Sequence, residues 1–320
     1  MKHSTLLRIN VEVASNLFMN LFLCALIAQG STVLASPNSS LQIKKQKGTS
    51  SHTYIEPKSV LIPAGSFQMG LDRGQAEYFV RKYKDKTVAG VFITEEMLRS
   101  QYSEQTPKHT VFLKAYRISK NLVTVGEYKI FCLATHRRMP PRVPKFNLQW
   151  HKNNHPIVGV SHEDANAYCQ WLSRMTGKSY RLPSEAEWEK AARGGLKGTL
   201  YPWGKRFDPK RLHFNRFNRS LFTVSGTAPV GSYPPNGYGL FDMAGNTAQW
   251  CLDGYDPTYY RISPKRNPIS NPLNDTHVLR GGHFFDTDED RFTCANRMRG
   301  GSPVGIEGFR CVLEIKPPFH

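Results

Sequence analysis

The densest group of side chains able to bind a metal ion lies in one short segment after residue 282. Its ionisable side chains belong to His283, Asp286, Asp288, Glu289 and Asp290. One imidazole with several carboxylates is a suitable donor set for ferrous iron, manganese or calcium. No second histidine accompanies the first, and a solvated acidic loop explains the same pattern more simply. The segment predicts either a metal site at His283, Asp286 and Asp288 or an exposed acidic turn.

Other catalytic signatures are absent from the sequence. It contains no Walker loop, no zinc-protease helix motif and no Gly-x-Ser-x-Gly elbow. These absences argue against P-loop nucleotide hydrolysis, zinc-protease chemistry and α/β-hydrolase chemistry.

The amino terminus has the pattern of a secretory signal. Lys2 and Arg8 precede an apolar run at residues 17–28, and small residues before position 36 fit a cleavage site after Ala35. We therefore expect a signal peptide at 1–35, a flexible linker at 36–57 and one domain at 58–316. The protein is expected to be exported, periplasmic or secreted, with no membrane span in the mature chain.

The formal net charge is +18, which favours anionic partners. The basic residues are scattered and form no nucleic-acid motif, so we expect no nucleic acid. The candidate partners are an unknown protein or an anionic component of the cell envelope. Solubility alone is the other explanation of the positive charge.

Helical capping patterns and periodicity predict the elements that position these residues. Helices are expected near 75–83 and 94–101, within a charged excursion that ends at a strand over 109–113. A third helix is expected over 124–134. The clearest helices run from Ser161 to Gly177 and over 181–193, the latter with Ser184 as cap and Glu187 in the boxed position. Beyond Gly194 the composition predicts loops and short strands.

An ordered series of motifs then points to one family. They lie at residues 62–70, 155–161, 181–188, 201–204, 226–230, 236–246, 280–282 and 308–311. Together they resemble the formylglycine-generating enzyme, or sulfatase-modifying factor, family over about residues 61–313. The resemblance implies an α+β fold of the C-type-lectin-like kind, loop-rich, with two main helices on short twisted sheets.

The resemblance also implies roles for the cysteines. Five follow the predicted leader, at positions 132, 169, 251, 294 and 311. Similarity implies a disulfide between Cys169 and Cys311. The family's second disulfide lacks one partner, because Ala192 occupies that position; Cys294 could pair with Cys251 instead. Cys132 fits a buried core thiol, and an odd number leaves one thiol unpaired unless two chains are linked.

The cysteine pair that carries the family's oxidation is missing. In active members two cysteines shortly after Arg-Gly-Gly bind copper, whereas this segment has none and Asp286 stands about where the first would be. A carboxylate cannot replace a thiolate on cuprous copper. Formylglycine generation by that mechanism is therefore not expected.

The family's structural calcium is a separate expectation. The matching positions are Asp242, Gly245, Thr247 and Gln249, the last of which is usually Glu. Calcium is the cofactor we predict, and the identity of any redox metal stays open.

Two function classes remain. One is a diverged metal- or oxygen-dependent oxidase, which would need a metal at His283 and the neighbouring acids. The other is a non-catalytic, lectin-like binding or scaffold module of the cell envelope. The second would show an exposed aromatic and basic groove near Tyr255, Tyr259, Tyr260 and Arg261.

Overall fold

The computed structural model describes residues 54–88, 91–141, 147–216, 226–271 and 275–315. The predicted signal peptide and most of the predicted linker lie outside these residues. Glu56, near the end of that linker, contacts the domain: its carboxylate accepts hydrogen bonds from Tyr180 Oη at 2.7 Å and from Lys178 Nζ at 2.5 Å.

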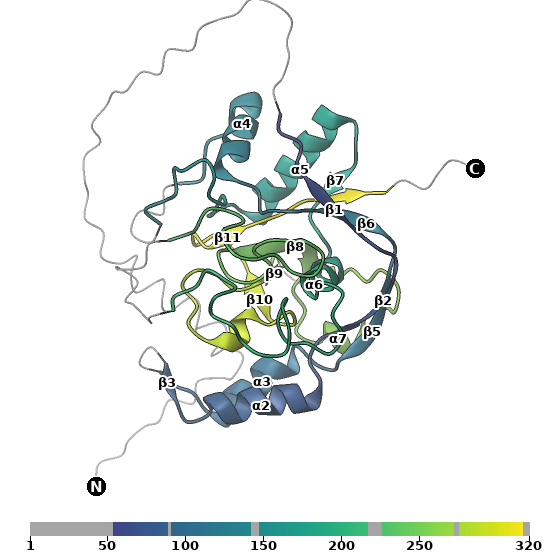
Figure 1. The fold of residues 1–320 in the computed structure, drawn as a ribbon, viewed down its shortest axis with the longest axis vertical. Coiled ribbons are helices and arrows are strands. Elements are labelled where there is room, and N and C mark those ends of the chain that lie inside the picture. Colours follow the sequence, from purple (N-terminus) through teal and green to yellow (C-terminus); the bar gives the residue numbers. More distant parts are fainter. Residues whose placement is uncertain (1–53, 89–90, 142–146, 217–225, 272–274, 316–320) are drawn as a thin grey trace, which may run out of the picture. The chain divides into compact units, whose positions relative to one another are not determined.

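Two four-stranded sheets form the centre of the domain (Figure 1). The first has the order β1 (Ser59–Ile62), β6 (Tyr116–Ser119), β12 (Val312–Glu314), β7 (Tyr180–Arg181) and is antiparallel. The second has the order β10 (Arg297–Gly300), β9 (His277–Arg280), β8 (Ala248–Gly254), β11 (Glu307–Gly308), with β11 parallel to β8. Two-stranded ribbons join β2 (Gly65–Met69) to β5 (His109–Leu113) and β3 (Thr87–Val88) to β4 (Val91–Phe92).

The helices predicted from the sequence are present, together with one short helix that was not predicted. They are α2 (Arg73–Tyr83), α3 (Glu95–Ser103), α4 (Val125–Thr135), α5 (His162–Thr176), α6 (Glu185–Ala192) and the single-turn α7 (Tyr259–Ile262). Thr124 caps α4, Ser161 caps α5 and Ser184 caps α6, each by accepting a hydrogen bond from a backbone N–H three residues on. Gly177 ends α5 in the left-handed conformation, with φ of 67°.

Two details differ from the sequence predictions. Residues 181–183 are not helical, because Arg181 belongs to strand β7 and pairs with Val312, and α6 starts only after its Ser184 cap. The helices expected near 75–83, 94–101 and 124–134 are present as α2, α3 and α4, with 11, 9 and 11 residues. The second difference is the single-turn α7, which was not predicted. Helices α2 and α3 pack against each other, and the ring of Phe79 stacks on that of Tyr102.

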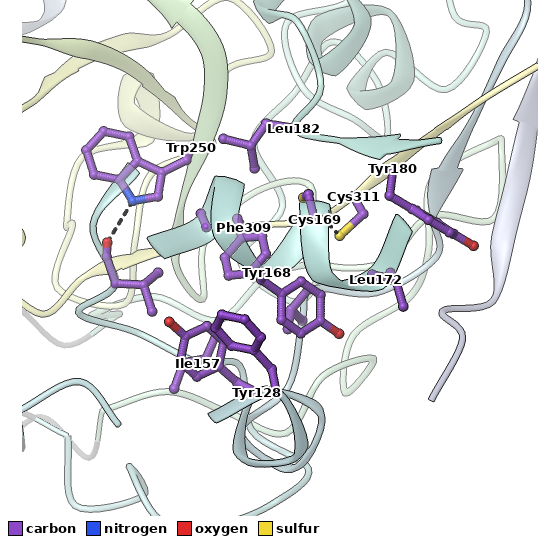
Figure 2. Close-up of a cluster of buried hydrophobic side chains, with 14 of the residues drawn as sticks. Tyr128, Ile157, Tyr168, Cys169, Leu172, Tyr180, Leu182, Trp250, Phe309 and Cys311 are labelled. Atoms are coloured by element: carbon purple, nitrogen blue, oxygen red, sulfur yellow. Dashed lines mark hydrogen bonds between the residues drawn. The ribbon is translucent and has the colours of Figure 1, made fainter. Parts of the chain in front are cut away.

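The main core fills the space between α4, α5 and the sheets (Figure 2). Tyr128, Tyr168 and Phe309 pack ring to ring there. Trp250 is fully buried and its indole N–H donates to the Val160 carbonyl at 2.8 Å. The Cys169 and Cys311 sulfur atoms lie 3.6 Å apart inside this core. In the part of the chain that the structure describes, no helix is long and apolar enough to cross a membrane.

A stacked pair of imidazoles connects α5 to β9. The rings of His162 and His277 have centroids 3.4 Å apart and planes within 11°. His162 Nε2 is 3.0 Å from the Cys251 carbonyl oxygen, and the buried Nδ1 of His277 has no hydrogen-bond partner in the described part of the chain. Burial and then the charge of His277 lower the pKa of His162 to about 4, and burial lowers the pKa of His277. The folded protein therefore holds both rings neutral.

Acidification should destabilise the fold through this pair. A histidine whose pKa is lower in the folded state binds its proton more readily in the unfolded chain, so stability is full above pH 6.5 and falls as the pH drops toward 4. For His162 the loss is on the order of 2–3 kcal/mol. Urea unfolding at pH 7 and pH 4.5 should show a smaller pH-dependent loss for His162→Gln than for the wild type. Equal losses in both proteins would contradict this role.

Candidate functional site

The segment that carries the predicted chemistry follows β9 through a tight glycine turn. Gly281 and Gly282 have φ of 95° and 67°. A Cβ on Gly282 would lie 2.9 Å from the Arg291 carbonyl oxygen and 3.0 Å from the Asp286 carboxylate. Any side chain there would push the turn away from the segment it supports.

Arg280, just before this turn, is the centre of a buried ion network. Its guanidinium is fully buried and lies 2.5 Å from the Glu189 carboxylate and 3.2 Å from the Glu185 carboxylate, both on α6. It also donates to the carbonyls of Cys294 and Ala295 at 2.6 and 3.0 Å. The network thus fixes the acidic segment and its return strand to α6.

Further partners neutralise both glutamates. Arg297 on β10 contacts Glu185 at 2.6 Å, and Arg193 contacts Glu189 at 2.6 Å. The Tyr260 hydroxyl lies 3.2 Å from Glu185 and 3.4 Å from Glu189. Opposite charges in contact explain how two carboxylates remain stable in the core.

The structure brings His283 and Asp286 together. The Asp286 carboxylate accepts a hydrogen bond from the His283 backbone N–H at 2.8 Å, and its second oxygen lies 3.5 Å from the imidazole Nε2. The backbone N–H of Phe285 donates to Nδ1 at 3.2 Å. Burial lowers the pKa of His283 and outweighs the opposing effect of Asp286. The pair therefore forms a self-contained turn with a neutral imidazole.

Two of the remaining acids, Glu289 and Asp290, face the α2–α3 excursion. Glu289 pairs with Lys82 at 2.5 Å and accepts from the Tyr78 hydroxyl at 3.2 Å. Asp290 accepts from the buried Tyr102 hydroxyl at 2.9 Å. Burial raises the pKa of Asp290, so its proton is retained to a higher pH than usual.

Asp288 stays near its own turn, where Thr287 Oγ1 lies 3.4 Å from its carboxylate. Within the described residues, no three His, Cys, Asp or Glu side chains gather in a metal-binding group. The segment is accordingly an anchoring surface for two helices, which sequence reasoning did not predict because those helices lie about 200 residues earlier.

The predicted calcium residues are engaged with protein partners. Asp242 accepts hydrogen bonds from the backbone of Gly231 at 2.8 Å and from Asn246 Nδ2 at 3.3 Å. The Gln249 amide oxygen accepts from both Trp188 Nε1 at 2.9 Å and Arg310 Nε at 2.7 Å. Both lone pairs of that oxygen are therefore used.

The hydroxyl of Thr247 donates to the Ile306 carbonyl, and the backbone N–H of Thr247 donates to the Gly245 carbonyl at 2.8 Å. In this arrangement the four residues do not fit a calcium site that includes Gln249 as a ligand. Calcium binding stays a prediction that titration must test.

The cysteines divide into one close pair and three separate thiols. Cys169 and Cys311 are buried neighbours, whereas Cys251 and Cys294 share a second core without a sulfur–sulfur contact. Burial raises the pKa of Cys294 to about 12. Cys132 is buried, as expected, and its thiol lies 3.5 Å from the Arg138 carbonyl. The disulfide between Cys169 and Cys311 stays a prediction, and the two sulfur atoms lie close to each other.

The predicted aromatic groove is not exposed. Tyr255 and Tyr260 are buried, and the Tyr255 hydroxyl donates to the Glu104 carboxylate. Their rings instead cover the guanidinium of Arg297 at 5.0 and 4.4 Å. The expectation was wrong for Tyr255 and Tyr260, whose rings stabilise a guanidinium of the ion network, whereas Arg261 is exposed. A binding role therefore has to use a surface other than this groove.

A small hollow elsewhere has features that sequence reasoning missed. It holds about 20 Å³ and is lined by Met139, Pro140, Pro141, Asn147, Trp150, Ile157 and Val158. The Asn147 side chain is fully buried, yet its amide nitrogen has no hydrogen-bond partner among the described residues. A hollow of this size has room for about one water molecule, which could accept a hydrogen bond from that amide.

Comparisons with known proteins agree with this architecture. The sulfatase-modifying factor enzyme 1-like domain family matches residues 45–315. The mouse formylglycine-generating enzyme is 31% identical over 292 residues, covering 81% of this chain and 76% of the enzyme. A mouse protein named inactive C-alpha-formylglycine-generating enzyme 2 is 39% identical over 176 residues, covering 51% of this chain and 50% of that protein.

Among solved structures, PvdO from Pseudomonas aeruginosa superposes with a TM-score of 0.63 at 26% identity, covering 81% of this chain and 95% of PvdO. The predicted α+β, C-type-lectin-like fold, loop-rich with short sheets, is confirmed by this likeness. The chain therefore belongs to the sulfatase-modifying factor enzyme 1-like domain family, and formylglycine-generating enzymes are among its relatives.

Proposed function

We propose that this member of the family does not generate formylglycine and acts as an exported, non-catalytic binding module. The observation that carries the proposal is the use of the acids after Arg-Gly-Gly. Asp286 closes a turn on His283, Glu289 pairs with Lys82, and Asp290 bonds to Tyr102. Each of these three carboxylates has a structural task, and Asp286 stands about where active relatives place a copper-binding cysteine.

A diverged oxidase is the second candidate, and one observation favours it. The His283 imidazole and Asp286 carboxylate are 3.5 Å apart and partly accessible, with 12% and 13% of their side chains exposed. Such a pair supplies two donors to a metal but needs at least one more. Among the other acids of the segment, Glu289 and Asp290 contact α2 and α3, and Asp288 stays beside Thr287. This use of the acids supports the binding module over the oxidase.

Elemental analysis of the purified mature protein distinguishes the two candidates. We expect no redox metal near one per chain, and the same result for His283→Ala/Asp286→Ala. A redox metal near one per chain that disappears in the double variant would support the oxidase and overturn our proposal. Incubation with a cysteine-containing sulfatase peptide should yield no formylglycine. The same analysis reports whether calcium is bound, and amino-terminal sequencing that begins at Ser36 would support export.

A further inference from the structure

The last two residues of α7 and the loop that follows it, together residues 261–269, form one surface with the edge of β5. The backbone N–H of Phe112 donates to the Lys265 carbonyl at 2.8 Å, and that of Asn267 donates to the Phe112 carbonyl at 2.9 Å. The N–H of Lys114 donates to Asn267 Oδ1 at 2.9 Å. The loop extends from α7, and Figure 1 shows α7 beside the β2–β5 ribbon. We call residues 261–269 with Lys114 the loop surface.

The loop surface carries cations without matching acids. Its basic residues are Lys114, Arg261, Lys265 and Arg266, and neither residues 261–269 nor β5 contains Asp or Glu. All four are exposed, and none has an ion-pair partner within the described residues. By contrast, Lys82 and Arg99 in the α2–α3 excursion are paired with glutamates. The loop surface is therefore a local excess of positive charge.

Large aliphatic side chains project among these cations. Ile262 is 71% exposed and Ile269 is 48% exposed. Exposing apolar surface to water is unfavourable, so polar side chains at these two positions would have a lower free energy of hydration. The Arg266 guanidinium lies 4.2 Å from the centroid of the half-buried Phe112 ring, which places an aromatic surface beside the charge. Cations interleaved with exposed apolar side chains are typical of segments that lie in a membrane interface.

We propose that the loop surface docks the protein onto an anionic phospholipid membrane. The four cations face the lipid phosphates, and Ile262 and Ile269 enter the boundary between headgroups and acyl chains. A soluble polyanion would satisfy the cations and leave both isoleucines in water, so the composition favours lipid. The proposal deepens the binding role proposed above by naming the partner. It can fail separately from it, because vesicle binding is measured without reference to metal or formylglycine.

Co-sedimentation of the full mature protein with vesicles tests this surface. We expect binding to phosphatidylcholine vesicles that contain phosphatidylglycerol, little binding to phosphatidylcholine alone, and weaker binding at high salt. Arg261→Glu/Lys265→Glu should lower the partition coefficient about tenfold or more. The matched control Lys205→Glu/Arg206→Glu reverses two exposed cations on another loop and should have a much smaller effect.

A third variant separates lipid from soluble polyanions. Ile262→Ser should weaken vesicle binding and leave any binding to heparin unchanged, because heparin offers charge without an apolar layer. Circular dichroism checks that each variant is folded. The proposal is overturned by absence of binding to anionic vesicles, by equal losses in the two double variants, or by an Ile262→Ser protein that binds vesicles like the wild type.

Discussion

Oxidised mature protein is expected to carry a disulfide between Cys169 and Cys311, and reduction should lower the free energy of unfolding by about 5 kcal/mol. The two sulfur atoms are 3.6 Å apart and both cysteines are buried, so little movement is needed to join them. The residues are 142 positions apart. A crosslink between such distant positions removes much of the conformational entropy of the unfolded chain.

Urea unfolding with and without reductant, together with intact mass, measures this effect. The matched control is Cys169→Ala/Cys311→Ala, which lacks both sulfur atoms of the predicted disulfide. Reductant should leave the free energy of unfolding of this variant unchanged. An unchanged midpoint in the wild type, or a mass that shows both thiols free after export, would count against the disulfide.

The second large effect is expected at Arg280. Arg280→Met should lower the free energy of unfolding by about 3–5 kcal/mol, because it leaves the buried carboxylates of Glu185 and Glu189 without their shared cation. Arg297 and Arg193 still contact one carboxylate each, so the fold should survive at low temperature. The methionine is long and apolar enough to fill most of the space left by the arginine stem.

An exposed ion pair gives the comparison for this variant. Arg137 contacts Asp164 at 2.9 Å, but 42% of the arginine side chain is exposed. Arg137→Met should therefore cost less than about 1 kcal/mol in the same urea experiment. If Arg280→Met is no more costly than Arg137→Met, the buried network does not hold the acidic segment to α6 as described.

The sequence alone determined the features that depend on neighbours along the chain. The caps of α4, α5 and α6 were predictable because Thr124, Ser161 and Ser184 bond to backbone groups only three residues away. Strand β5 and the loss of the catalytic cysteines were equally visible, since alternation and residue type are local properties. The fold could also be predicted from the sequence, because the order of the motifs resembles that of a family whose fold is known.

Only the tertiary structure decided how the polar residues are used. Glu289 and Asp290 looked like metal ligands in sequence, yet they meet Lys82 and Tyr102, which come from the distant excursion. His162 and His277 are 115 positions apart in the numbering and become a stacked pair through the packing of α5 on β9. A carboxylate or imidazole has the same sequence signature whether it binds a metal, an ion partner or water. Its role depends on which groups the fold brings within a few ångströms, and that distance is set by long-range packing.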